Sequence, residues 1–221
     1  MKFKKLEFEN NDGQVLSARL DLPVAGKPAA YALFAHCFTC SKNIKAIAHI
    51  TRALNQEGIA VMRFDFTGLG ESEGDFADTN FSSNVEDLIG AAELLQAHYQ
   101  GPRILIGHSF GGAAVLQAAQ RIPSSKAVVT IAAPADPQHV TQSLGSATQI
   151  IQSRGEAEVS LAGRTFKLKK QFLDDLQFVN MKETIKKINR ALLVLHSPVD
   201  ETVGIDNAAQ IFQAVRLPKS I

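Results

Sequence analysis

Five short, almost fully apolar runs alternate along the chain with segments whose apolar residues recur at helical spacing. The runs cover residues 31–35, 59–64, 103–107, 127–131 and 191–195. A strand is apolar on both sides when both faces of its sheet are covered, and crossover helices cover parallel strands in this way. The alternation therefore predicts an α/β fold with a doubly wound, mostly parallel sheet and helices on both faces.

The intervening helices are visible as apolar stripes, and two antiparallel strands around Asn11–Gly13 precede them. Gly58 follows the first stripe, as is typical of a helix C-terminus, while Ser83 and Glu86 have capping-box spacing at the start of the second. A third helix is expected to run from Phe110 to about residue 121. The stripe residues are Ile44, Ile47, Ile50 and Leu54, then Val85, Leu88, Ile89, Ala92 and Leu95, and last Ile205, Ala208, Phe212 and Val215.

The stretch between residues 134 and 190 is too long for a simple crossover. Its pattern predicts a helix, a hairpin around Ala162–Gly163, and one or two further helices. Long insertions in compact domains are often functional. We interpret residues 135–189 as a cap over the C-terminal edge of the sheet, within a single domain that spans residues 1–221. An elaborated crossover without a role in binding is the alternative.

Charge and composition exclude several classes of protein. Lys plus Arg total 23 against 22 for Asp plus Glu, so a general nucleic-acid binder is not indicated. The N-terminus lacks the apolar run of a secretory signal, and no uncharged apolar stretch is long enough to span a bilayer. Two cysteines, three residues apart, are too few for a disulfide framework. We expect a cytoplasmic protein with reduced thiols and no cofactor.

The most specific motif is Gly107-His108-Ser109-Phe110-Gly111, which matches G-x-S-x-G. It lies between an apolar strand and a helix, which is the context that a nucleophile elbow requires. The bend is so tight that side chains two positions from the serine would collide with neighbouring elements. Ser109 is thereby predicted to project its hydroxyl above the sheet at a helix N-terminus, where backbone N–H groups favour an oxyanion.

From about Ala29 to Ile221 the chain resembles the α/β-hydrolase superfamily. Three further segments carry the resemblance: F-A-H-C-F at 34–38, F-D-F-T-G-L-G-E-S at 64–72, and H-S-P-V-D-E-T-V at 196–203. The string His-Cys-Phe-Thr-Cys-Ser is similar to bacterial hydrolase modules, some of which are joined to an OsmC-type, thiol-dependent peroxide-reducing domain.

The resemblance implies a role for individual residues. Asp200 would be the acid that orients a catalytic histidine, with Glu201 as its neighbouring rival. The backbone N–H groups of Phe38 and Phe110 would form the oxyanion hole. The histidine should follow one more strand beyond about Ser220, so the last strand and helix of the fold are expected to be missing from this sequence. Of the six histidines present, only His139 is a candidate substitute, and none is assigned.

These roles imply a serine hydrolase that cleaves small, apolar carboxylic esters through an acyl-enzyme on Ser109; a peptidase is an alternative within the family. Cys37 and Cys40 form a C-x-x-C motif that suits dithiol redox chemistry, although two thiols lining a pocket is the simpler interpretation. A redox-linked or inactive binding module is therefore the second hypothesis. The expected partner is a small-molecule ester, with no metal, nucleic acid or membrane. Exposed apolar surface at the end of the sheet predicts a homo-oligomer.

Overall fold

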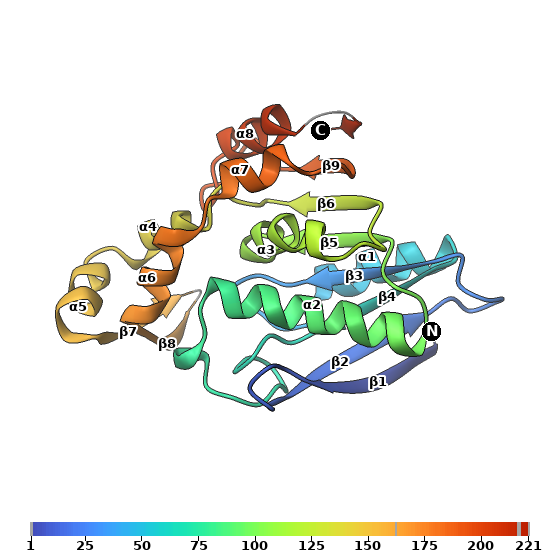
Figure 1. The fold of residues 1–221 in the computed structure, drawn as a ribbon, viewed down its shortest axis with the longest axis horizontal. Helices are drawn as coiled ribbons and strands as arrows, with labels where there is room; N and C mark the ends of the chain where they lie inside the picture. Colours follow the sequence, from blue (N-terminus) through green and yellow to red (C-terminus); the bar gives the residue numbers. More distant parts are fainter. Residues whose placement is uncertain (1, 162, 216–217, 221) are drawn as a thin grey trace.

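A computed structural model describes residues 2–161, 163–215 and 218–220, and in these residues the chain forms an eight-stranded sheet (Figure 1). The strand order is β1-β2-β4-β3-β5-β6-β9-β10. The first two strands pair antiparallel, β2 is antiparallel to β4, and the remaining neighbours are parallel. The predicted α/β fold with a mostly parallel sheet is confirmed. The strands are β1 (Lys2–Glu9), β2 (Val15–Leu22), β3 (Ala30–Ala35), β4 (Ile59–Phe64), β5 (Ile104–His108), β6 (Ala127–Ile131), β9 (Ala191–Leu195) and β10 (Lys219–Ser220).

Helices cover both faces of this sheet. On β3, Ala32 and Phe34 pack with Ile47 of α1 (Lys45–Gln56), whereas Leu33 belongs to the larger cluster on the opposite face. That cluster also holds the buried sides of α2 (Phe81–His98), α3 (Phe110–Ala118) and α8 (Asp206–Ala214). Neither face of the central strands meets water, which explains their nearly continuous apolar sequences.

The helix boundaries agree with the stripes, with one correction. Gly58 follows α1 with a φ of +77°, as the stop signal predicted. The capping box of α2 was assigned to Ser83 and Glu86, and this assignment is wrong. Asn80 is the N-cap: its side chain accepts from the Ser83 N–H, and its own N–H donates to the Ser83 hydroxyl. Glu86 forms an ion pair with Arg121 instead.

Residues 135–161 and 163–189 form an insertion between β6 and β9, drawn yellow to orange in Figure 1, and its buried side chains join the larger cluster of the core. The single helix expected at its start is divided into two, because Gly145 interrupts it with a φ of +52°. The predicted hairpin is present, although Ala162 at its turn lies outside the described residues. The insertion contains α4 (Val140–Leu144), α5 (Ala147–Arg154), β7 (Glu156–Leu161), β8 (Arg164–Lys169), α6 (Lys170–Phe178) and α7 (Met181–Lys186).

The side of β9 that faces the α1 layer is open. Leu192 and Val194 are buried in the larger cluster, so Leu193 and Leu195 point the other way, and these two are 36% and 44% exposed. Self-association through apolar surface at this end of the sheet stays a prediction. None of the described helices has the length and apolar character needed to cross a bilayer. The cytoplasmic location likewise stays a prediction.

Candidate active site

Ser109 lies in a sharp bend between β5 and α3, with a φ of +53° and a ψ of −123°. The bend brings backbone into such close approach that two of its glycines have no room for a side chain. A Cβ on Gly107 would lie 2.2 Å from the Gly111 carbonyl oxygen, and one on Gly111 would lie 2.3 Å from that of His36. Strained backbone of this kind is concentrated at functional sites. The structure thus contains the strand–turn–helix that the motif predicted.

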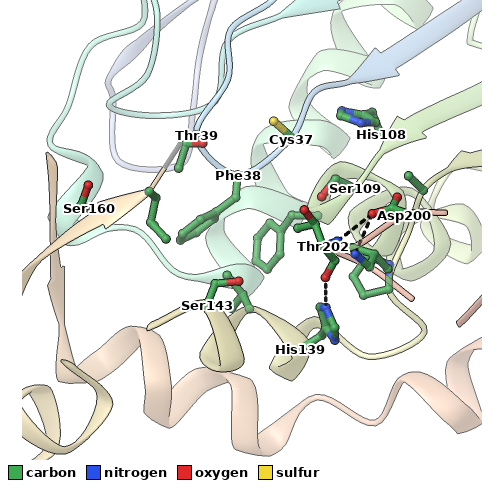
Figure 2. A pocket seen from close by; sticks show the side chains of 16 residues that line it. Cys37, Phe38, Thr39, His108, Ser109, His139, Ser143, Ser160, Asp200 and Thr202 are labelled. Carbon is green, nitrogen blue, oxygen red and sulfur yellow. Dashed lines mark hydrogen bonds between the residues drawn. The ribbon is translucent and has the colours of Figure 1, made fainter. Parts of the chain in front are cut away.

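A cavity of about 500 Å³ lies in front of Ser109 (Figure 2). Its walls come from five parts of the chain: the elbow, the loop after β3, the residues directly after β6, the loop after β9, and the 135–189 insertion. Phe38, Phe110 and Asp200 all line it, so the structure brings these residues together with Ser109. The other lining residues are Cys37, Thr39, His108, Ala132, Pro134, His139, Val140, Ser143, Ser160, Leu161, Thr202 and Val203.

Asp200 is held in the loop after β9 by backbone donors. Its Oδ1 accepts from the N–H groups of Thr202 and Val203, each at 2.9 Å (Figure 2). Its Oδ2 lies 3.8 Å from Nε2 of His196. The rival Glu201 is exposed and does not line this cavity. Of the two acids, Asp200 is the one that lines the same cavity as Ser109.

Two residues of the cavity wall have backbone N–H groups without an acceptor among the described residues. Phe110 is the first residue of α3, so its N–H has no acceptor within the helix. Among the described residues, neither it nor the Phe38 N–H donates to another protein group. The two rings pack with centroids 4.8 Å apart, which places the residues side by side at the cavity wall.

His36 holds the start of the loop that carries Phe38. The ring is buried, and burial lowers the pKa of His36 to about 4, so it is neutral at pH 7. Its Nδ1 lies 2.8 Å from the Cys37 carbonyl oxygen, and its Nε2 lies 3.4 Å from the Phe66 N–H. A neutral imidazole that donates from Nδ1 and accepts at Nε2 satisfies both contacts.

The expectation of reduced thiols is wrong, because Cys37 and Cys40 form a disulfide. A turn brings them together: the Cys40 N–H donates to the Cys37 carbonyl at 3.2 Å, and the two Cα atoms are 5.2 Å apart. That separation is ordinary for a disulfide. Sequence spacing alone did not decide between a bridge and two free thiols.

A buried ion-pair cluster, which no sequence pattern predicts, holds the other end of the same loop. Lys42 is buried and bonds to Asp65 and to Glu71, and its backbone N–H donates to the Asp65 carboxylate at 2.6 Å. Arg63, itself paired with Asp21, donates to the Lys42 carbonyl. The segment at 64–72 contains Asp65, but nothing in its spacing points to the lysine partner.

No histidine bonds to the Ser109 hydroxyl in the part of the chain that the structure describes. His108 lines the cavity, and burial lowers the pKa of its imidazole while the charge of Asp200 acts in the opposite direction. His139 also lines it, but its Nε2 bonds to the Thr202 carbonyl at 2.8 Å. The remaining histidines are His196, bonded to a backbone carbonyl, and His49 and His98, on exposed helix surfaces. The structure therefore assigns no catalytic histidine among the described residues.

No group of three acidic, histidine or cysteine side chains suited to a metal ion occurs within residues 2–161, 163–215 and 218–220.

Comparison with known proteins agrees with this geometry. The sequence model of a family described as Serine aminopeptidase, S33 matches residues 26–171. Human monoglyceride lipase is 28% identical over 211 residues, which cover 86% of this chain and 68% of that protein. Mouse mitochondrial palmitoyl-protein thioesterase ABHD10 is 35% identical over 94 residues, covering 42% of this chain and 30% of that protein.

Among solved structures, the esterase domain of a Rhodothermus marinus protein is 55% identical, with a TM-score of 0.80, and the match covers 99% of this chain and 86% of that one. Est1E from Butyrivibrio proteoclasticus, solved with ferulic acid, is similar in fold, with a TM-score of 0.79. It is 20% identical in sequence, and the match covers 97% of this chain and 88% of Est1E. The family match spans more than half of the sequence. The chain therefore belongs to the serine aminopeptidase S33 family of α/β-hydrolases.

Proposed function

We propose that this chain hydrolyses small, apolar carboxylic esters through an acyl-enzyme on Ser109. The observation that carries the proposal is the convergence of three features on one cavity. These are a strained serine at a helix N-terminus, a carboxylate held by two backbone donors, and two N–H groups without acceptors. Nucleophilic acyl transfer needs all three.

The proposed reaction has two halves. The Ser109 oxygen attacks the ester carbonyl carbon while a base takes its proton, and the carbonyl oxygen becomes an oxyanion between the N–H groups of Phe38 and Phe110. The alcohol leaves with a proton, and water then hydrolyses the acyl-serine. Asp200 orients and stabilises the imidazole that serves as the base.

The cavity walls favour an apolar acyl group. Phe38, Phe110, Val140 and Leu161 line it, and the polar side chains there are mostly uncharged hydroxyls. A peptidase acting at an amino terminus needs a carboxylate to bind the ammonium group. Among the described lining residues Asp200 is the one carboxylate, and two backbone N–H groups already bind it. The esterase name of the 55% identical Rhodothermus marinus domain also supports an ester substrate.

The test is hydrolysis of p-nitrophenyl butyrate, with and without added imidazole. Imidazole serves as an external base, because no histidine among the described residues bonds to Ser109. We expect Ser109→Ala to abolish the enzyme-dependent rate, a loss of at least about 10³-fold, and Asp200→Asn to lower it strongly. Ser153→Ala, an exposed serine on α5, is the matched control and should keep the full rate.

Labelling by a fluorophosphonate gives a second readout that needs no turnover. Mass spectrometry should locate the label on Ser109. The proposal would be refuted if Ser109→Ala released p-nitrophenol as fast as the wild type, or if the fluorophosphonate labelled another residue.

A further inference from the structure

We propose that the Cys37–Cys40 disulfide is a thiol–disulfide exchange site that sets the rate of the ester hydrolysis: the oxidised chain is fast and the reduced chain is slow. This inference rests on the proposed function, since it assigns to the disulfide the control of the same oxyanion hole. The partners of the exchange are low-molecular-weight thiols and disulfides that enter the substrate cavity.

The disulfide closes the turn that presents one oxyanion donor. Phe38 and Thr39 are the two central residues of this turn, and the Phe38 N–H is the donor without an acceptor. Among the described residues, the Cys40 N–H also closes the turn by donating to the Cys37 carbonyl, and Arg164 donates to the Thr39 carbonyl at 3.2 Å. A hydrogen bond of this kind contributes about 1 kcal/mol, so the covalent bridge is the stronger constraint on the direction of the Phe38 N–H.

The loop is anchored on both sides of the disulfide by contacts that do not involve sulfur. His36 bonds to the carbonyl at its start, and the buried Lys42–Asp65 pair holds its end. The Phe38 ring packs on Phe110 and Phe172, with centroids 4.8 and 5.1 Å away. Reduction should therefore loosen the turn locally while the fold and the cavity persist.

The disulfide can be reached through the cavity. Cys37 is only partly buried and lines the same space as Ser109 (Figure 2). A small thiolate entering there attacks the Cys37 sulfur, the S–S bond breaks, and Cys40 leaves as a thiolate that takes a proton. A second thiolate attacks the outer sulfur of the mixed disulfide and releases a free disulfide and the Cys37 thiolate. Two thiols thus supply two electrons, and a small disulfide reverses both steps.

Loss of an entire oxyanion donor lowers kcat by about 10²–10³-fold. Reduction leaves the Phe38 N–H in place but less well directed, so a smaller effect of about tenfold on kcat is expected, with little change in KM. Butyrate ester hydrolysis is measured for the chain oxidised with glutathione disulfide and then reduced with dithiothreitol. The 2 Da mass difference between the two forms verifies each state.

The matched variant is Cys40→Ser, which keeps the cavity-lining Cys37 and cannot form the bridge. We expect the slow rate of the reduced chain, no response to dithiothreitol, and an unchanged far-ultraviolet spectrum. The reduced wild-type chain should regain the fast rate when glutathione disulfide is added back, whereas Cys40→Ser should not. Equal kcat in the verified oxidised and reduced forms, or a Cys40→Ser variant as fast as the oxidised wild type, overturns the inference.

Hydrogen exchange separates this inference from the proposed function, because it needs no turnover. The Cys40 amide should exchange several-fold faster in the reduced chain, while amides of β3 and α1 stay unchanged. If exchange responds and neither form hydrolyses esters or takes a fluorophosphonate, the proposed function fails while the constraint on the turn holds. If the Cys40 amide exchanges equally in both forms, the inference fails whatever the activity.

Discussion

Replacing Ser109 with glycine should make the protein more stable while removing the proposed nucleophile. Ser109 has a φ of +53°, a region where a Cβ is unfavourable. Such a residue costs about 1–3 kcal/mol, and glycine adopts the same backbone without that penalty. Glycine also gains freedom in the unfolded chain, which offsets about 0.5–1 kcal/mol. The net expectation is a gain of about 1 kcal/mol in the free energy of unfolding.

Ser109→Ala is the matched control, because it removes the same hydroxyl but keeps the Cβ and therefore the strain. No hydrogen bond from the Ser109 side chain is formed in the described part of the chain, so alanine should leave stability within about 0.5 kcal/mol of the wild type. Both variants should be inactive, which separates the effect on strain from the effect on catalysis.

Urea unfolding measures the three proteins directly. For a chain of 221 residues, about 1 kcal/mol corresponds to an increase of about 2–4 °C in Tm, so thermal unfolding provides a second measurement. Ala132, which also lines the cavity and has a φ of +49°, gives an independent case: Ala132→Gly should be stabilising for the same reason. A Ser109→Gly variant no more stable than Ser109→Ala would refute the argument that the elbow stores strain.

Two further predictions concern the supports of the oxyanion loop. Burial lowers the pKa of His36 to about 4 from 6.5, so the neutral form is favoured by folding, and this stability is present above pH 6.5 and lost as the pH falls toward 4. Urea unfolding of the wild type should show the free energy of unfolding falling by about 2 kcal/mol between pH 7 and 5, and His36→Asn should remove this fall. An equal dependence of the unfolding free energy on pH in the variant would contradict an origin in His36. Lys42→Met leaves the buried Asp65 without its cation and should lower stability by about 3–5 kcal/mol at pH 7. Adding Asp65→Asn should recover part of the loss, and a single variant within about 1 kcal/mol of the wild type would show that the pair matters little.

The strands and the elbow were predictable because their signals are local. The apolar runs at 59–64, 127–131 and 191–195 coincide with β4, β6 and β9, and the G-x-S-x-G turn has the bend expected between β5 and α3. A strand covered on both faces requires a run of consecutive apolar residues, and a tight bend requires glycines at fixed positions. The start of α2 was misplaced, since Asn80 and Ser83 form a capping box as good as the one chosen at Ser83 and Glu86.

Only the folded chain decides which distant residues meet. The bridge from Cys37 to Cys40 depends on the turn that the loop adopts, and Lys42 meets Asp65 because two neighbouring parallel strands end at the same edge of the sheet. In the same way Val140 and Leu161 become walls of the Ser109 cavity, although nothing near them in the sequence marks them. Periodicity and turn chemistry depend on residues that are neighbours in the sequence. The sequence alone therefore determined the sheet and the bend that holds Ser109, the proposed nucleophile. Contacts among loops depend on where strands end in space, so the tertiary structure decided the support of the oxyanion loop and the shape of the cavity.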